Sequence, residues 1–369
     1  MNIVFVQHIF LKNFRCHKHA SWPLQQGVNL LIGPNGSGKT SFLEAVFIAV
    51  YGHSFRQSKT PDLVHFNEEE FQIDLQWLRY GPLHLQVKGN KKNIIRTLQG
   101  KKITIKKDFL RSFPIVFDST VTSRFIDGTP NDRRKWLDAL LFLCKPHLKH
   151  VYQNYLRAMM QRQRALRYNH HRDMLLIWES QMVEMGKVLS LEKIQLIEKI
   201  NEKLADEMLC LNANVQFELA VDQNNLNEDW LNQLKNNRDS DKKLGRTQFG
   251  PHADKLSILF YGKDIRSIAS RGQQKLVTIA IRLAECALRD YYQKSLPLLM
   301  LDDGLESLDS DYQYLLFQRL NLYLGQVLLT TPSVRDIGDD LRIQSYTIGE
   351  SVSAVDGNVK RSSIMERAA

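Results

Sequence analysis

A glycine-rich stretch near the N-terminus has the residue types and spacing of a phosphate-binding loop. Residues 33–40 fit the pattern G-x-x-x-x-G-K-[ST] at every fixed position. Glycines let backbone N–H groups turn inward around a phosphate, and a helix starting at the lysine adds the positive end of its dipole. Lys39 would reach the β- and γ-phosphates, and the Thr40 hydroxyl would bind Mg²⁺. We expect the whole loop to bind ATP or GTP: Gly33, Pro34, Asn35, Gly36, Ser37, Gly38, Lys39 and Thr40.

Two carboxylates end an apolar run in the last third of the chain. Residues 298–303 read Leu-Leu-Met-Leu-Asp-Asp, which predicts a buried strand with an acidic carboxyl end. Beside a nucleotide crevice, Asp302 would hold Mg²⁺ and Asp303 would orient or deprotonate the attacking water. A helix cap or a solvated turn could also present two acids, but the phosphate-binding motif favours chemistry. We therefore predict Asp303 and Lys39 as catalytic residues, with Thr40 and Asp302 as metal ligands.

A polar stretch shortly before the acidic strand adds a third part to this chemistry. Residues 270–275 read Ser-Arg-Gly-Gln-Gln-Lys and lead into an amphipathic helix predicted over 276–291. The stretch resembles the signature of ABC ATPases, in which a helix start and a serine bind phosphate. In that superfamily the signature completes the nucleotide site of the opposite subunit, so the resemblance implies an ATP-dependent homodimer. Ser270, Gly272 and Gln273 are expected on that ATP, although a plain polar helix cap would look similar.

Apolar and alternating runs predict the elements that must position these residues. The run at 28–32 predicts a strand before the loop, and apolar residues at helical spacing follow it to Val50. Residues 70–117 largely alternate apolar and polar, which predicts an antiparallel sheet with one face in water. The run at 113–117 is expected to return to the central sheet. The fold class we predict is α/β: an ABC-ATPase-like head with a mixed or parallel sheet and an antiparallel β subdomain, plus a helical arm domain.

The middle of the chain predicts the arm. Helical periodicity runs from 132 to about 214, and a composition rich in Asn, Asp and Lys predicts a mobile connector over 222–245. The predicted division is an ATPase head of residues 1–131 and 246–350, an arm and connector of residues 132–245, and a disordered tail of residues 351–369.

The order of these and further motifs resembles the RecF family of bacterial recombination mediators. The motifs are Asn13-Phe14-Arg15, the loop 33–40, Ser54-Phe55-Arg56, the run 132–138, Gly250-Pro251-His252, the stretch 270–275 and Leu301-Asp302-Asp303. The resemblance implies a weak, DNA-stimulated ATPase that binds ATP and Mg²⁺ and dimerises on double-stranded DNA. It also implies action with RecO and RecR, which together help load RecA at gapped DNA. Arg15, just before the loop, is expected to contact nucleotide phosphate.

Three positions depart from the RecF pattern. Ala253 follows Gly-Pro-His where the family usually has Arg, and Ala269 precedes the signature serine where Leu is usual. Asp118-Ser119 stands where the family usually has Pro-Glu. That loop normally helps couple the nucleotide to the arm, so the resemblance says least about coupling.

The charge balance suggests a polyanionic partner. The net charge is +10 and the isoelectric point is near 9.3. Arg157, Arg164 and Arg167 are separated by three, by seven or by ten residues, so on a helix they lie near one face. A solvated charged face would give the same pattern. The residues expected to contact DNA are Arg133, Arg134, Arg157, Arg164 and Arg167; Arg162 lies on the same predicted helices.

Several other functions share these motifs. A transporter-type ABC ATPase subunit is disfavoured by the predicted arm and the basic charge, and an SMC-like chromosome or break-repair ATPase would need far longer coiled coils. An ATP-gated scaffold without DNA affinity stays open. No apolar run is long enough to span a bilayer. The scattered cysteines indicate reduced thiols in a cytoplasmic protein: Cys16, Cys144, Cys210 and Cys286.

Overall fold

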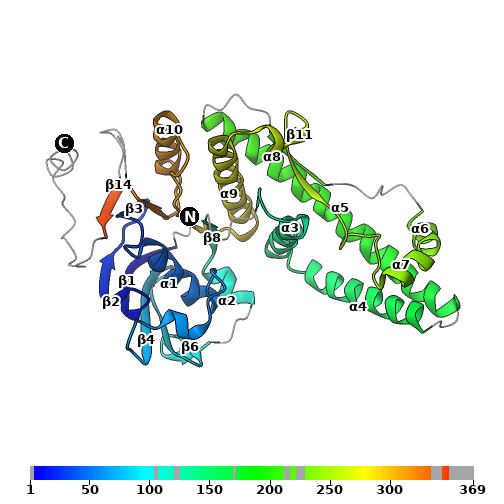
Figure 1. Ribbon diagram of the computed structural model, residues 1–369, viewed down its shortest axis with the longest axis horizontal. Coiled ribbons are helices and arrows are strands. Elements are labelled where there is room, and N and C mark those ends of the chain that lie inside the picture. The colour runs from blue at the N-terminus through cyan, green and yellow to red at the C-terminus, as the bar shows by residue number, and fades with distance from the viewer. Residues whose placement is uncertain are drawn as a thin grey trace. The chain divides into compact units, whose positions relative to one another are not determined.

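The chain folds as two compact units (Figure 1). The computed structural model describes residues 4–103, 107–119, 125–168, 172–211, 217–221, 229–333 and 343–348. The first unit comprises Met1–Ser123, Glu207–Asn214 and Ser270–Ala369, and the second comprises Arg124–Asp206 and Val215–Ala269. Residues 246–269, which the sequence-based division put in the head, thus belong to the second unit.

A five-stranded parallel sheet forms the centre of the first unit. Its order is β14-β3-β13-β12-β8, and every neighbouring pair is parallel. Every residue of β12 and β13 is buried, as expected for a parallel sheet covered on both faces. Because the carboxyl ends of parallel strands meet at one edge, the loop after β3 and the acids after β12 lie at the same edge. The strands are β3 (Val28–Ile32), β8 (Ile115–Ser119), β12 (Leu298–Asp302), β13 (Val327–Thr331) and β14 (Ile343–Thr347).

A six-stranded antiparallel sheet makes up the second layer of this unit. Its order is β2-β1-β4-β5-β6-β7. Buried and exposed residues alternate along β4 and β5, which confirms the predicted sheet with one wet face. The strands are β1 (Phe5–Phe14), β2 (His17–Pro23), β4 (Glu70–Leu78), β5 (Pro82–Asn90), β6 (Ile94–Leu98) and β7 (Lys101–Lys102).

Helix α1 (Lys39–Tyr51) packs against strands of both sheets. It is apolar nearly all round, as a helix buried on several sides must be. The two sheets and α1 share one apolar core. This arrangement confirms the predicted α/β head. The other helices of the unit are η1 (Thr60–Leu63), α2 (Lys107–Ser112), α9 (Arg271–Gln293) and α10 (Ser310–Asn321).

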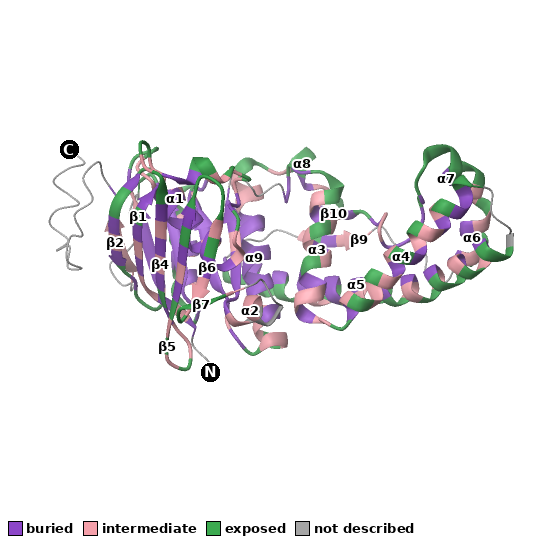
Figure 2. Ribbon diagram, turned by 90° about the horizontal axis from the view of Figure 1, so that it is seen from below, coloured by how far each residue is buried: buried purple, intermediate pink, exposed green. Residues whose placement is uncertain are grey.

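The second unit is mainly helical. Helix α3 begins with a capping box between Thr129 and Asp132, with proline at its first position. Helices α4 and α5 run alongside each other, each with a buried side and an exposed side (Figure 2). The elements are α3 (Pro130–Cys144), α4 (Leu148–Arg167), α5 (Arg172–Cys210), α8 (Ile265–Ile268) and the antiparallel strands β9 (Phe217–Val221), β10 (Leu256–Phe260) and β11 (Lys263–Asp264). Among the described residues, no helix has the length and apolar character needed to cross a membrane.

Two helices occupy most of the segment predicted as a mobile connector. They are α6 (Trp230–Asn236) and α7 (Arg238–Leu244). Trp230 and Leu234 are buried in one apolar cluster with residues of α4 and α5. The connector prediction was wrong here because a polar composition hides two side chains that anchor the helix. Residues 222–228 and the predicted tail 351–369 lie outside the described residues.

Candidate active site

The phosphate-binding motif forms a tight loop between β3 and α1. Gly36 and Gly38 have φ angles of 86° and 102°, in the region that favours glycine. A β-carbon at Gly38 would also lie 2.5 Å from the ring of His17, so the loop excludes larger residues there. The Lys39 ammonium donates to the carbonyl oxygens of Gly33 (2.6 Å) and Pro34 (3.0 Å). A lysine has three donors, so one remains for an anion in the loop.

Asp302 is the centre of a group of hydroxyls at the carboxyl edge of the parallel sheet. Thr40 Oγ1 donates to Asp302 Oδ1 at 3.0 Å, so the structure brings together the two predicted metal ligands. Thr330 Oγ1 also donates to Oδ1 at 2.9 Å, and Ser119 Oγ donates to Oδ2 at 3.0 Å. Sequence analysis did not single out Ser119 and Thr330. Both end strands that neighbour β12, and knowledge of the strand order would have found them.

The donor set around Asp302 fits Mg²⁺. One buried carboxylate and a threonine hydroxyl are hard oxygen ligands, and Mg²⁺ typically takes one or two carboxylates together with phosphate oxygens. In the described parts of the chain, no cluster of three or more His, Cys, Asp or Glu residues could hold a metal without such a substrate. The site therefore suits a metal that arrives with a nucleotide.

Asp303 is placed for proton chemistry. Its φ angle is 49°, and its backbone N–H donates to Thr330 Oγ1 at 2.9 Å, which turns the side chain away from the strand. Asp303 Oδ1 is buried and has no hydrogen-bond partner among the described residues. Burial, and then the neighbouring Asp302 carboxylate, raise the pKa of Asp303, while Lys39 opposes this rise. A carboxylate of this kind is suited to bind and deprotonate a water.

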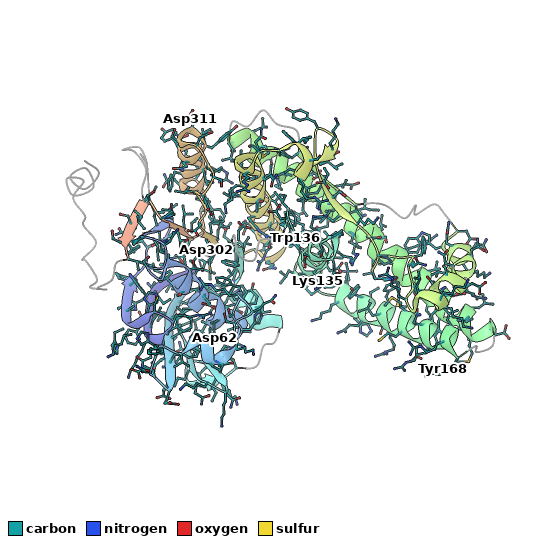
Figure 3. All side chains as sticks on the ribbon, viewed as in Figure 1. Asp62, Lys135, Trp136, Tyr168, Asp302 and Asp311 are labelled. Atoms are coloured by element: carbon teal, nitrogen blue, oxygen red, sulfur yellow. The ribbon has the colours of Figure 1, made fainter. Side chains whose placement is uncertain are left out.

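These residues line a pocket of about 450 Å³. The loop and α1 contribute one wall, and Asp303 contributes another. Asp62 and Val64 also line it; Asp62 and Asp302 are labelled in Figure 3. A volume of this size and a lining with both signs of charge suit a nucleotide triphosphate with its metal.

Arg15 also faces this pocket, as predicted. Its guanidinium donates to both carboxylate oxygens of Glu44, at 2.9 Å and 2.6 Å, and to the carbonyl oxygen of Asp62 at 2.7 Å. Glu44 is fully buried and follows Thr40 by one helical turn. The ion pair therefore fixes Arg15 relative to the phosphate loop. Arg56 lines the same pocket, with its guanidinium 4.0 Å from Glu44.

The signature stretch begins α9 and does not line this pocket as described. Ser270 Oγ accepts from the Gln273 N–H at 3.2 Å, and Gln273 Oε1 accepts from the Ser270 N–H at 2.9 Å. This capping box presents Ser270 to solvent. A β-carbon at Gly272 would lie 2.8 Å from the carbonyl oxygen of Ser307. The role of Ser270, Gly272 and Gln273 on the ATP of a second copy stays a prediction.

Asp118 and Ser119, which depart from the family pattern, join α9 to the acidic site. The buried Asp118 carboxylate accepts from Lys275 at 3.4 Å and from Arg282 at 3.5 Å, both on α9. Ser119, the next residue, holds Asp302. The end of β8 therefore contacts the signature helix through one side chain and the metal-binding carboxylate through the next.

The arginines predicted to bind DNA fall into two groups. Arg157, Arg164 and Arg167 are exposed on α4. Arg133 is buried, and its guanidinium donates to backbone carbonyls, including that of Leu256 at 2.7 Å. Arg133 thus holds α3 to β10, and we correct its predicted DNA contact.

The two remaining arginines are also engaged within the unit. Arg134 is half-buried and donates to the carbonyl oxygen of Asp254 and to Asn131. Arg162 is wholly buried and paired with two carboxylates. A basic residue in the sequence shows its charge but not its burial, so the exposed set on the arm is smaller than predicted.

Comparison with known proteins places these features in a family. The AAA domain family matches residues 8–248. The DNA replication and repair protein RecF of Lachnospira eligens is 31% identical over 331 residues, which cover 86% of this chain and 90% of that protein. A structure of the recombination mediator protein RecF with ATP, in the RecFOR pathway, has a TM-score of 0.75 and 25% identity and covers 95% of this chain and 99% of that one. A Smc head domain from Pyrococcus furiosus, bound to the C-terminal domain of ScpA, shares the fold with a TM-score of 0.60 and 16% identity, over 94% of each chain.

The loop, the acid pair and the signature helix thus occur on an ABC-type ATPase head, in a chain that matches RecF over most of its length. The chain belongs to the RecF family of DNA replication and repair proteins.

Proposed function

We propose that this protein is an ATP-hydrolysing switch that binds double-stranded DNA in recombinational repair and replication restart. The observation that supports this best is the 3.0 Å hydrogen bond between Thr40 and Asp302, beside a phosphate loop and the unpaired Asp303 oxygen. These groups are the parts that phosphoryl transfer to water requires.

The residues of the pocket divide the work. Lys39 and Arg15 neutralise the phosphates, and Thr40 and Asp302 hold Mg²⁺, which offsets the charge that develops on the phosphoryl oxygens. Asp303 accepts a proton from the attacking water as its oxygen bonds to the γ-phosphorus and the bond to the β-phosphate oxygen breaks. The raised pKa of Asp303 improves it as a base.

The proposed switch is an ATP-dependent homodimer. Ser270, Gly272 and Gln273 would contact the ATP of the second copy, so hydrolysis would release the pair. The link through Asp118 and Ser119 supports communication between the acidic site and the signature helix. The solved relative is titled as part of the RecFOR pathway, and we propose that this chain likewise acts with RecO and RecR to load RecA at gapped DNA.

Helix α4 is the proposed DNA contact. Its sequence contains no Asp or Glu, and its solvent side carries Arg157, Arg164 and Arg167. Guanidinium groups on one exposed face contact phosphates without reading sequence. Binding should therefore be independent of sequence and fall steeply with salt.

Replacing Lys39 with Met should weaken ATP binding by about 10- to 100-fold. The change removes a charge-assisted hydrogen bond to phosphate, worth about 1.5–3 kcal/mol. Calorimetry with Mg·ATP measures the affinity, and circular dichroism checks the fold. Lys12→Met, an exposed lysine outside the pocket, is the matched control. An unchanged affinity in a folded Lys39→Met protein would contradict the assigned role.

Reversing Arg157, Arg164 and Arg167 to Glu should abolish duplex binding while ATP binding survives. The salt dependence measured at lower occupancy should also flatten, by about 0.9 in slope for each lost phosphate contact. Gel shifts in a salt series measure both effects. Reversing Lys88, Lys92 and Lys101, which are exposed on the first unit, changes the net charge equally and serves as the control. Duplex binding at wild-type concentrations by the α4 variant would move the DNA site elsewhere.

A further inference from the structure

Helix α5 carries an exposed stripe with the spacing of a coiled-coil seam. The positions alternate by three and four residues, and all six side chains are exposed. We call them the α5 stripe: Met174, Ile177, Gln181, Glu184, Val188 and Leu191. The opposite side of the helix packs into the second unit, where Met182 and Leu189 are 1% and 0% exposed. The stripe therefore lies on the solvent side of a well-packed helix.

Four of the six stripe residues are large and apolar. Met174 and Ile177 are 44% and 55% exposed, and Val188 and Leu191 are 42% and 47% exposed. The two apolar pairs are separated by two heptads, with Gln181 and Glu184 in the heptad between them. The solvent face of an amphipathic helix is normally polar, whereas apolar residues at the first and fourth heptad positions are typical of a face that packs on another helix.

The charge of the stripe argues against nucleic acid as its partner. Glu184 lies at its centre, and Asp173 and Glu198 are exposed at or beyond its ends on the same helix. The exposed face of α4, in contrast, carries only basic and uncharged residues. A phosphate backbone suits α4 and is repelled by the α5 stripe.

We propose that the α5 stripe packs antiparallel on the α5 stripe of a second copy of this chain. A two-fold axis between Met182 and Val183 matches the stripe to itself. Met174 then meets Leu191 of the other copy, Ile177 meets Val188, and Gln181 meets Glu184, whose carboxylate can accept from the amide. Each contact occurs twice, as an isologous interface requires.

Other registers and the parallel direction are less favourable. A shift by one heptad in either direction places apolar residues opposite Gln181 and Glu184. A parallel pair in register places Glu184 against the same residue of the other copy, and two like charges at one position repel. Only the antiparallel register joins all four apolar residues without facing two acids.

The pairing should be weak on its own. The stripe spans about 25 Å at 1.5 Å per residue. A contact between two helices of this length lies below the roughly 1,200 Å² of surface that stable specific interfaces bury. We therefore expect an association that rises with protein concentration and needs no nucleotide, distinct from the proposed ATP-dependent dimer.

Disulfide trapping tests the register. In a background with the exposed Cys16 and Cys210 changed to Ser, and without nucleotide, Ile177→Cys/Val188→Cys should give a covalent dimer on mild oxidation. The two cysteines are about 16 Å apart within one helix, so they cannot bridge inside one chain. Ile177→Cys/Gln195→Cys is the matched control, because Gln195 has no partner in the proposed register and the variant should stay monomeric. Ile177→Cys alone should also stay monomeric, since only a parallel pair would join it to itself.

A second change tests the apolar contribution. Adding Val188→Glu to the single-cysteine variant series is unsuitable because it alters a trapped position, so Leu191→Glu is added to Ile177→Cys/Val188→Cys. The covalent dimer should then be lost. Because the mutation is on the exposed side of α5, circular dichroism and ATP binding should not change. A dimer that persists in this variant, a dimer of Ile177→Cys alone or of the control pair, or no dimer of the test pair at any soluble concentration would each overturn the proposal. None of these outcomes depends on the ATPase function, because no nucleotide is present.

Discussion

Replacing Asp303 with Asn should reduce ATP hydrolysis by about 10²- to 10⁴-fold while Mg·ATP still binds. The amide keeps the shape of the side chain and cannot accept the proton of the attacking water. Lys39, Thr40 and Asp302, which hold the phosphates and the metal, are unchanged. If hydrolysis releases a nucleotide-bridged dimer, the variant should also accumulate dimers with ATP.

Phosphate release and light scattering measure the two effects. Asp311→Asn, an exposed acid in the first turn of α10, is the control and should behave as wild type. Normal turnover in Asp303→Asn would remove Asp303 as the base. A monomer at saturating ATP would contradict the bridged dimer while leaving the assignment of the base intact.

The same residue predicts the acid limb of the pH profile. Asp303 must be ionised to accept a proton, so hydrolysis should fall as pH falls through its pKa. Burial and the adjacent Asp302 raise that pKa, and the fall should therefore be centred above the value of about 3.9 for a free aspartate. Initial rates at saturating Mg·ATP across the acid range, with ATP binding checked at each pH, would measure it.

Replacing Arg162 with Met should destabilise the second unit by about 3–5 kcal/mol. Arg162 is fully buried and donates to Glu179 at 3.1 Å, to Asp241 at 2.7 Å and to the carbonyl oxygen of Leu234 at 2.7 Å. It thereby joins α4 to α5, α6 and α7. Its loss leaves two buried carboxylates, for which Arg238 alone compensates by pairing with Glu179.

Hydrogen exchange resolved along the chain is the suitable measurement, because two units need not unfold together. Protection in α4, α6 and α7 should fall in Arg162→Met, whereas the β12 and β13 strands should keep theirs. Arg164→Met, two residues along α4 and exposed, should change stability by less than about 0.5 kcal/mol. Equal effects of the two substitutions would show that the buried ion pairs add little.

Local motifs predicted the centre of the active site well. The residues from β3 through α1 are contiguous, and the acid pair directly ends β12, so their geometry follows from short stretches of chain. Ser119 and Thr330 were missed because they reach Asp302 only through the parallel order of β8, β12 and β13. Strand order depends on long-range pairing, which a single sequence does not display.

Burial of charge was the other limit of prediction. Arg133 and Arg164 look alike in sequence, yet the first is enclosed by backbone carbonyls and the second is exposed. Glu44 is similar, because an acid inside an apolar helix gives no sign that an arginine from another segment will pair with it. In each case the partner lies on a distant part of the chain.

The central sheet also constrains when the protein can become active during its synthesis. Strand β3, which leads into the phosphate loop, pairs only with β13 and β14 among the described strands, and these lie about 300 residues later in the chain. A ribosome-bound chain that has exposed β3 and the whole second unit still lacks both of its neighbours. The phosphate loop can therefore assemble only when translation is nearly complete, whereas the helices of the second unit can fold earlier. Nascent chains of this protein should bind no ATP until their final segment leaves the ribosome.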